Sequence, residues 1–210
     1  MPADPVIGIL EMPIGNLRSV RNAVYENGFD PELVGNDADF DDLSHLIVPG
    51  VGNFTAVMRH LEEEGLAQRV RDFAASGRPV LGICAGMQLL ATRGTEGGDT
   101  PGLGLVEAVV TRLPEESGLV IPHVGWSTVT LHFPHPVTEG VKPGRDFYFV
   151  HSYAMHTDTP EARLGTSDYG TQFVSIVARD NVVGFQFHPE KSQANGLKLI
   201  ENFCLWDGQC

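Results

Sequence analysis

A short glycine-bounded motif after an apolar run constrains the fold of this chain more than any other feature. Residues 79–81 are Pro-Val-Leu, and residues 82–86 read Gly-Ile-Cys-Ala-Gly. An apolar run that meets a glycine is typical of a buried strand entering a sharp turn, where a β-carbon would crowd nearby backbone. Residues 85–92 continue at helical spacing. The motif therefore predicts a strand, a tight turn at Cys84 and a helix over residues 85–92.

The first half of the chain alternates strand-like and helix-like segments. Residues 6–10 and 45–48 are short apolar runs that predict buried strands, and Pro49-Gly50-Val51-Gly52 interrupts the second. Asn16 is the expected N-cap of the first helix. Strands alternating with helices indicate a parallel sheet covered on both faces. Besides residues 85–92, the helices of this half are expected over residues 17–26, 54–64 and 66–75.

The second half is richer in short strand-like runs separated by turn signals. Asp180-Asn181 lies between two such runs and predicts a tight hairpin, and Gly118 is another turn signal. A last helix is expected over residues 193–205. We therefore expect one α/β domain over residues 1–210, with a central, mostly parallel mixed sheet flanked by helices and a smaller antiparallel sheet in the second half. The predicted strands of this half are residues 105–113, 120–121, 127–131, 147–153, 173–179 and 182–187.

Charge and cysteine content exclude several classes of protein. The net charge of −13 argues against nucleic acid and anionic membranes as partners, since both are negatively charged. No apolar run reaches the length of a membrane span, and the first residues lack the basic region of a signal peptide. Three cysteines (Cys84, Cys204 and Cys210) are too few and too unevenly numbered for a disulfide framework. A cytoplasmic location is therefore expected.

Cys84 is the candidate nucleophile. The positive end of the helix that begins at Ala85 would favour its thiolate, and the Ala85 N–H is a natural oxyanion donor. A second donor could come from the 49–52 loop, with Gly52 at its end. His188 and Glu190 follow another apolar run and are two residues apart, so an extended segment would point both to one side, where they could act as a base and the acid that orients it. The alternative for His188 is a surface or satisfied core histidine. The alternative is that Cys84 is a small buried core residue.

Other motifs are too incomplete to predict a metal or a cofactor. His132 and His135 have a His-x-x-His spacing, but no cysteine or acidic ligand accompanies them. Gly102-Leu103-Gly104 lacks the third glycine of a dinucleotide loop. We therefore expect no bound metal and no cofactor.

The segments around Cys84 and His188 together resemble class I glutamine amidotransferases. More narrowly, they resemble the glutaminase subunits of imidazole glycerol phosphate synthases. The motifs appear in the order of that family and span nearly the whole chain. They are residues 15–20 (Gly-Asn-Leu-Arg-Ser-Val), 49–52 (Pro-Gly-Val-Gly), 82–88 (Gly-Ile-Cys-Ala-Gly-Met-Gln), 122–126 (Pro-His-Val-Gly-Trp), 148–153 (Tyr-Phe-Val-His-Ser-Tyr) and 186–192 (Gln-Phe-His-Pro-Glu-Lys-Ser).

The resemblance implies a role for each matched residue. Cys84, His188 and Glu190 would form the catalytic triad that hydrolyses L-glutamine to L-glutamate and ammonia through a thioester. Gly52 and Ala85 would supply the oxyanion N–H groups. The glutamine amino-acid end would be held by Gln88, Glu96, Ser152 and Tyr153.

The resemblance also implies a partner. Ammonia would pass to a (β/α)8-barrel cyclase subunit in a heterodimer that makes imidazole glycerol phosphate and 5-aminoimidazole-4-carboxamide ribonucleotide (AICAR) in histidine biosynthesis. Core packing is the alternative for Trp126 and Tyr148. The residues expected at or near the docking face are Asn16, Asn53, His123, Trp126, Tyr148 and Lys191.

The chain departs from the family pattern at Ala85, Val124, Ser127 and residues 11–14, which are Glu-Met-Pro-Ile. These departures leave the ammonia acceptor open. The glutaminase could feed ammonia to another synthase, such as an enzyme of sugar amidation in surface-polysaccharide synthesis. A non-catalytic regulatory or assembly subunit is the alternative of another class, and a thiol peptidase on a similar scaffold is a third.

Overall fold

The computed structural model describes residues 4–12, 16–36, 40–115 and 119–210. Gly15, which belongs to one of the family-like motifs, and the turn signal Gly118 lie outside these ranges, as do residues 13 and 14. None of the helices within them is both long and apolar enough to cross a membrane.

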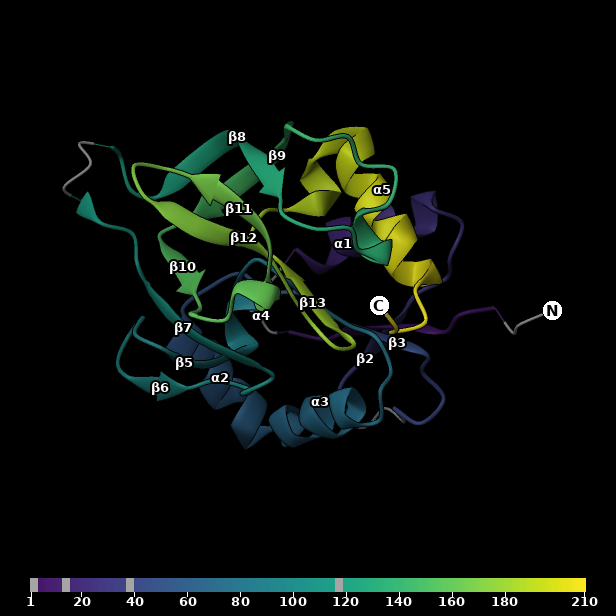
Figure 1. Ribbon diagram of the computed structural model, residues 1–210. Helices are drawn as coiled ribbons and strands as arrows, with labels where there is room; N and C mark the ends of the chain where they lie inside the picture. The colour runs from purple at the N-terminus through teal and green to yellow at the C-terminus, as the bar shows by residue number, and fades with distance from the viewer. Residues whose placement is uncertain (1–3, 13–15, 37–39, 116–118) are drawn as a thin grey trace.

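A branched mixed sheet forms the centre of the described chain, and helices cover both faces of its parallel half (Figure 1). Four adjacent pairs of this half run parallel. All four residues of β1, β3, β4 and β13 are buried, which explains their unbroken apolar character. Across the sheet its strands are β2 (Glu32–Val34), β1 (Ile7–Leu10), β3 (His45–Val48), β4 (Val80–Ile83) and β13 (Val182–Phe185).

The other strands extend the sheet from β13. The β12–β13 hairpin turns at Asp180-Asn181, as predicted, and Asp180 has a φ of 51°. The path continues through β12 (Gln172–Arg179), β10 (Tyr153–His156), β7 (Val106–Arg112), β5 (Ala91–Gly94) and β6 (Thr100–Pro101). A branch leaves β12 through β11 (Arg163–Asp168), β8 (His123–Leu131) and β9 (Arg145–His151).

The helices follow the predicted amphipathic pattern. In Figure 1, α1 (Leu17–Glu26) and α5 (Gln193–Leu205) lie on one side of the parallel strands, and α2 (Phe54–Glu63) and α3 (Leu66–Ala75) lie on the other. Each buries an apolar stripe against the sheet, as spacing of three and four residues requires. Short 3-10 turns occupy Pro136–Thr138, Pro160–Ala162 and Pro189–Lys191.

Three local predictions are wrong. The helix expected over residues 85–92 is only α4 (Ala85–Leu89), because Ala91 already pairs with Val106 of β7. Residues 147–153 form the end of β9 and the start of β10 rather than one strand, since the chain changes partner from β8 to β7 at Ser152. Residues 120–121 are not a strand; the Val120 side chain is 77% exposed and Pro122 has no N–H to donate.

Gly86 provides a test of how tightly the turn after β4 is packed. A β-carbon on Gly86 would lie 1.8 Å from the Val48 carbonyl oxygen, whereas one on Gly35 would meet nothing closer than 3.5 Å. Helix propensity alone would favour alanine at Gly86 by about 1 kcal/mol. We instead expect Gly86→Ala to lower the free energy of unfolding by about 2–4 kcal/mol.

Urea denaturation measures this change, and Gly35→Ala is the matched control with an expected shift of less than about 1 kcal/mol. Equal stabilities of the two variants would contradict the close approach of β3 to the turn.

Candidate active site

Cys84 occupies a strained turn between β4 and α4. Its backbone has φ 53° and ψ −111°, which is rare for a residue with a β-carbon. The turn is held because the Cys84 N–H donates to the Phe185 carbonyl at 2.7 Å. The side chain is 6% exposed, and its sulfur lies 3.7 Å from the Val150 carbonyl oxygen. The turn thus directs the thiol toward strand β9 at the edge of a buried apolar cluster that includes Cys84.

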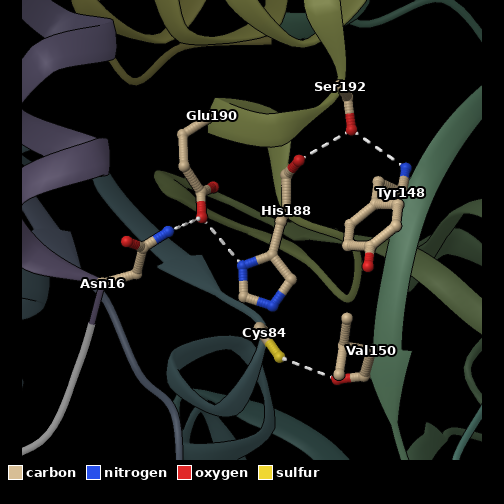
Figure 2. Close-up of polar contacts among 7 residues, drawn as sticks. All are labelled: Asn16, Cys84, Tyr148, Val150, His188, Glu190 and Ser192. Atoms are coloured by element: carbon tan, nitrogen blue, oxygen red, sulfur yellow. Dashed lines mark hydrogen bonds and ion pairs between the residues drawn. The ribbon is translucent and has the colours of Figure 1, made fainter. Parts of the chain in front are cut away.

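His188 and Glu190 face this thiol from the end of β13. Figure 2 shows the imidazole of His188 between Cys84 and Glu190. His188 Nδ1 lies 2.8 Å from Glu190 Oε1, and neither side chain is more than 4% exposed. The backbone of His188 is fixed because its N–H donates to the Tyr148 carbonyl and its carbonyl accepts from the Ser192 hydroxyl. The three predicted triad residues therefore lie together.

The charge of His188 is set by its two neighbours. Burial by itself would lower the pKa of this imidazole, but the hydrogen bonds and negative charges of Cys84 and Glu190 outweigh burial and raise the pKa to about 10. His188 is therefore an imidazolium at neutral pH. The site thus places a cationic histidine beside a cysteine sulfur, the pairing of base and nucleophile found in cysteine enzymes.

The triad opens into a cavity of about 430 Å³. All the residues predicted to bind substrate or to donate to an oxyanion line it, namely Gly52, Ala85, Gln88, Glu96, Ser152 and Tyr153. A second cavity of about 600 Å³ lies along residues 131–141 and contains none of the predicted catalytic or substrate-binding residues. We assign the site to the smaller of these two cavities because Cys84 and His188 line it and do not line the larger one.

Gln88 and Glu96 each keep one oxygen without a partner among the described residues. Gln88 Nε2 donates to the Tyr153 carbonyl at 2.8 Å and to Gln186 Oε1 at 3.1 Å. Since a carbonyl can only accept, the Gln88 nitrogen must face Tyr153, and its oxygen is left over. Glu96 Oε2 accepts from the Phe54 N–H at 2.9 Å, at the start of α2. Two acceptors thus remain in the cavity wall for a cationic group.

The Pro49–Gly52 loop packs directly on the nucleophile turn. A β-carbon on Gly50 would lie 2.6 Å from the Gly86 nitrogen, so the two backbones are in contact. Gly52 has a φ of 125°, a conformation open to glycine and strained for other residues. The loop therefore lies beside Cys84, as an oxyanion donor requires.

The residues predicted for a docking face divide into exposed, partly buried and buried groups. Trp126 is 47% exposed, so simple core packing is excluded for it, and its ring meets Tyr148 edge-on at 5.8 Å. The Lys191 ammonium lies 6.0 Å from the Tyr148 ring. Asn53 is half-buried and caps α2 by accepting from the Ala56 N–H. His123 is only 2% exposed and lies behind the face rather than on it.

Motif reading did not give the contacts of two residues of the site. Asn16 was expected to cap α1, but its side chain makes no capping bond and instead donates to Glu190 Oε1 at 2.8 Å. Figure 2 shows it on the side of Glu190 away from the His188 ring. His151 lies in the cavity wall, although no role was predicted for it. Only the presence of both residues in family-like motifs pointed to them.

Comparisons with known proteins agree with this geometry. Residues 9–206 match the family model described as glutamine amidotransferase class-I. The chain is 45% identical to imidazole glycerol phosphate synthase subunit HisH of Desulfitobacterium hafniense over 96% of this chain and 94% of the relative. It is also 45% identical to the subunit of the same name from Symbiobacterium thermophilum, over 94% and 92% of the two chains.

A solved structure supports the fold. The chain superposes on the PurLQS structure from Thermotoga maritima with a TM-score of 0.75 and 21% identity, covering 95% of this chain and 97% of the other. The α/β architecture with a mixed central sheet is therefore confirmed.

The pKa of His188 tests the triad geometry. Glu190→Gln keeps the shape of the side chain but removes its negative charge, so we expect the pKa of His188 to fall by about one unit or more. Folded-state stability should change with it. A raised histidine pKa stabilises the fold fully below about pH 6.5, and this contribution is lost as pH rises toward about 10.

Proton NMR titration of the His188 ring measures the shift. Glu201→Gln, which removes a half-exposed partner of Lys198, is the matched control and should leave the His188 pKa unchanged. An unchanged His188 pKa in Glu190→Gln would contradict the proposed contact.

Proposed function

This chain belongs to the class-I glutamine amidotransferase family, and we propose that it is the glutaminase subunit of an imidazole glycerol phosphate synthase. The observation that carries the proposal is the Cys84 turn with His188 and Glu190 behind it, opening into one cavity. Relatives named HisH at 45% identity over most of their length favour this synthase over sugar amidation. Residues 1–210 would form one glutaminase domain.

The reaction follows from the positions of the three side chains. The Cys84 thiolate attacks the carboxamide carbon of L-glutamine and forms a tetrahedral intermediate. His188, as imidazolium, gives its proton to the amide nitrogen, which leaves as ammonia and yields a glutamyl thioester. His188 then takes a proton from water, the water oxygen attacks the thioester, and L-glutamate leaves as the Cys84 thiolate reforms. Glu190 holds the ring and stabilises its charged form throughout.

Backbone N–H groups stabilise the negative oxygen of both intermediates. The Ala85 N–H follows the nucleophile directly, and Gly52 lies in the loop that packs on the same turn. Each such donor contributes about 3 kcal/mol to the transition state in comparable enzymes. The free acceptor oxygens of Gln88 and Glu96 suit the α-ammonium group of glutamine. Ser152 and Tyr153 complete the wall around the amino-acid end.

The synthase subunit would dock on the exposed part of β8 and its neighbours. Val124 is 55% exposed and Trp126 is 47% exposed, and residues two apart on a strand point to the same face. Tyr148 meets the Trp126 ring, Lys191 lies over the Tyr148 ring, and Asn53 and Lys191 both line the triad cavity. A (β/α)8-barrel cyclase covering this surface would receive ammonia from Cys84 without releasing it to water, in a heterodimer of the cytoplasm.

Replacing the nucleophile separates the two halves of the synthase reaction. We expect Cys84→Ser, assayed with the cyclase subunit, to lose at least about a thousandfold in glutamine-dependent activity. Activity with added ammonium salt should survive, because the cyclase site is untouched. Product formation is followed with both nitrogen donors. If wild-type protein gives no product from glutamine in a pair that works with ammonia, the proposed function is wrong.

The docking surface is tested by truncating its exposed aromatic residue. We expect Trp126→Ala to raise the dissociation constant for the cyclase subunit at least about tenfold, equivalent to about 1.4 kcal/mol. Leu205→Ala is the control, because Leu205 is 65% exposed on α5, outside this surface. Isothermal titration calorimetry measures both. Equal affinities for the two variants would place the interface elsewhere.

A further inference from the structure

Two buried histidines outside the triad form a continuous hydrogen-bonded chain that ends at the glutamine cavity. His123 on β8 and His151 on β9 are directly opposite in the antiparallel ladder, and His123 Nδ1 lies 3.0 Å from His151 Nε2. His151 Nδ1 lies 2.8 Å from the Tyr153 carbonyl oxygen. At the other end, His123 Nε2 lies 2.9 Å from the Ser127 hydroxyl. The two imidazoles are 2% and 5% exposed.

The direction of this chain is fixed by its last acceptor. A carbonyl oxygen can only accept, so His151 must carry its proton on Nδ1. Both imidazoles are neutral at pH 7, because burial lowers the pKa of His123 to about 4 and that of His151 to about 3. The unprotonated Nε2 of His151 then accepts from Nδ1–H of His123. His123 Nε2 in turn accepts from the Ser127 hydroxyl.

The surrounding side chains leave the imidazoles little freedom to turn. The ring of His123 is stacked on Tyr169 at 4.0 Å and on Phe149 at 5.0 Å. Tyr169 is itself anchored, because its hydroxyl donates to the Val120 carbonyl. His151 lies 5.0 Å from the Phe173 ring. Side chains needed only for packing would carry no polar atoms, because burying a polar atom costs free energy unless it is hydrogen-bonded.

The hydrogen-bonded chain of histidines ends at the Tyr153 carbonyl, which orients Gln88. The Tyr153 carbonyl accepts from His151 and from Gln88 Nε2, so both of its lone pairs are used. Both hydrogens of the Gln88 amide are also used, the second by Gln186. The rotation of the Gln88 amide is therefore set by a carbonyl that His151 holds in place.

We propose that His123 and His151 are positioning residues that fix the Tyr153 carbonyl and thereby turn the Gln88 oxygen toward the bound substrate. The inference rests on the proposed function, since glutamine is that substrate. Within the described residues, the hydrogen bonds of the two imidazoles join them to each other, to Ser127 and to Tyr153, and not to Cys84 or His188. Their loss should therefore weaken glutamine binding more than the chemical step, because a displaced binding group costs affinity while Cys84 and His188 stay in place.

The first experiment is steady-state glutamine hydrolysis by the complex with the cyclase subunit. We expect His151→Phe to raise KM for glutamine at least about tenfold, with kcat changed less than about threefold. His151→Asn should restore most of the wild-type KM, because its amide nitrogen occupies the place of Nδ1 and can still donate to Tyr153. His132→Phe is the matched control, since His132 pairs with Thr166 away from the cavity. An unchanged KM in His151→Phe would overturn the proposal.

Alkylation of Cys84 by iodoacetamide separates positioning from general damage. This reagent carries no amino-acid group, so its rate should be the same in wild type and both His151 variants. A rate that falls together with glutamine affinity would mean that His151 supports the fold and not Gln88, and would overturn the proposal.

Nitrogen-15 NMR of the histidine rings gives a readout that needs no turnover of glutamine. We expect His123 and His151 to be neutral at pH 7 with the proton on Nδ1 in both. In the wild-type protein, a proton on Nε2 of His151, or a charged ring of either histidine, would overturn the inference. Conversely, a wild-type complex with this tautomer pattern and no glutamine hydrolysis would refute the proposed function and leave the hydrogen-bonded chain established.

Discussion

The parallel pairing of β4 with β13 is the constraint on which the site depends. Ile83 pairs with Phe185, so the residues that follow both strands meet at the same edge of the sheet. The Cys84 N–H extends the ladder by donating to the Phe185 carbonyl at 2.7 Å. A slip of one residue would turn the side chains of one strand to the opposite face and separate the thiol from the imidazole. Residues about 100 apart in sequence thus become a catalytic pair through backbone bonds alone.

The turn at Cys84 is strained, and tight packing keeps it in place. A residue with a β-carbon at φ 53° costs on the order of 1–3 kcal/mol unless the surroundings enforce it. Gly82 and Gly86 let the turn lie against its own strand and against the Val48 carbonyl, in contacts too short for a β-carbon. The strained conformation of Cys84 therefore depends on the two glycines that flank it. The motif can be recognised in the sequence because only glycine fits at each of these two close contacts.

The sequence was most informative where residue type and backbone geometry are tied together. The glycine motif, the helices of the first half and the Asp180-Asn181 hairpin follow from such local rules. It was least informative where long-range pairing overrides local preference. The end of α4 at Leu89, the break at Ser152 and the short strands β2 and β6 depend on partners distant in the chain. Likewise, the motifs identified Cys84, His188 and Glu190 as candidate residues of the site but could not predict the hydrogen bond that Asn16 donates to Glu190.

The position of Asn16 shows how the site draws on the rest of the fold. As a side-chain cap it would stabilise α1 by about 0.5–2 kcal/mol, and it forgoes that bond in the structure. The side chain of Glu190 is fully buried, and within the described residues its Oε2 has no hydrogen-bond partner. In the part of the chain that the structure describes, the hydrogen bonds that compensate this buried carboxylate are those of His188 and Asn16 to Oε1. A buried charge without hydrogen bonds costs more free energy than a missing side-chain cap. The fold is therefore stabilised more when Asn16 donates to Glu190 than when it caps α1.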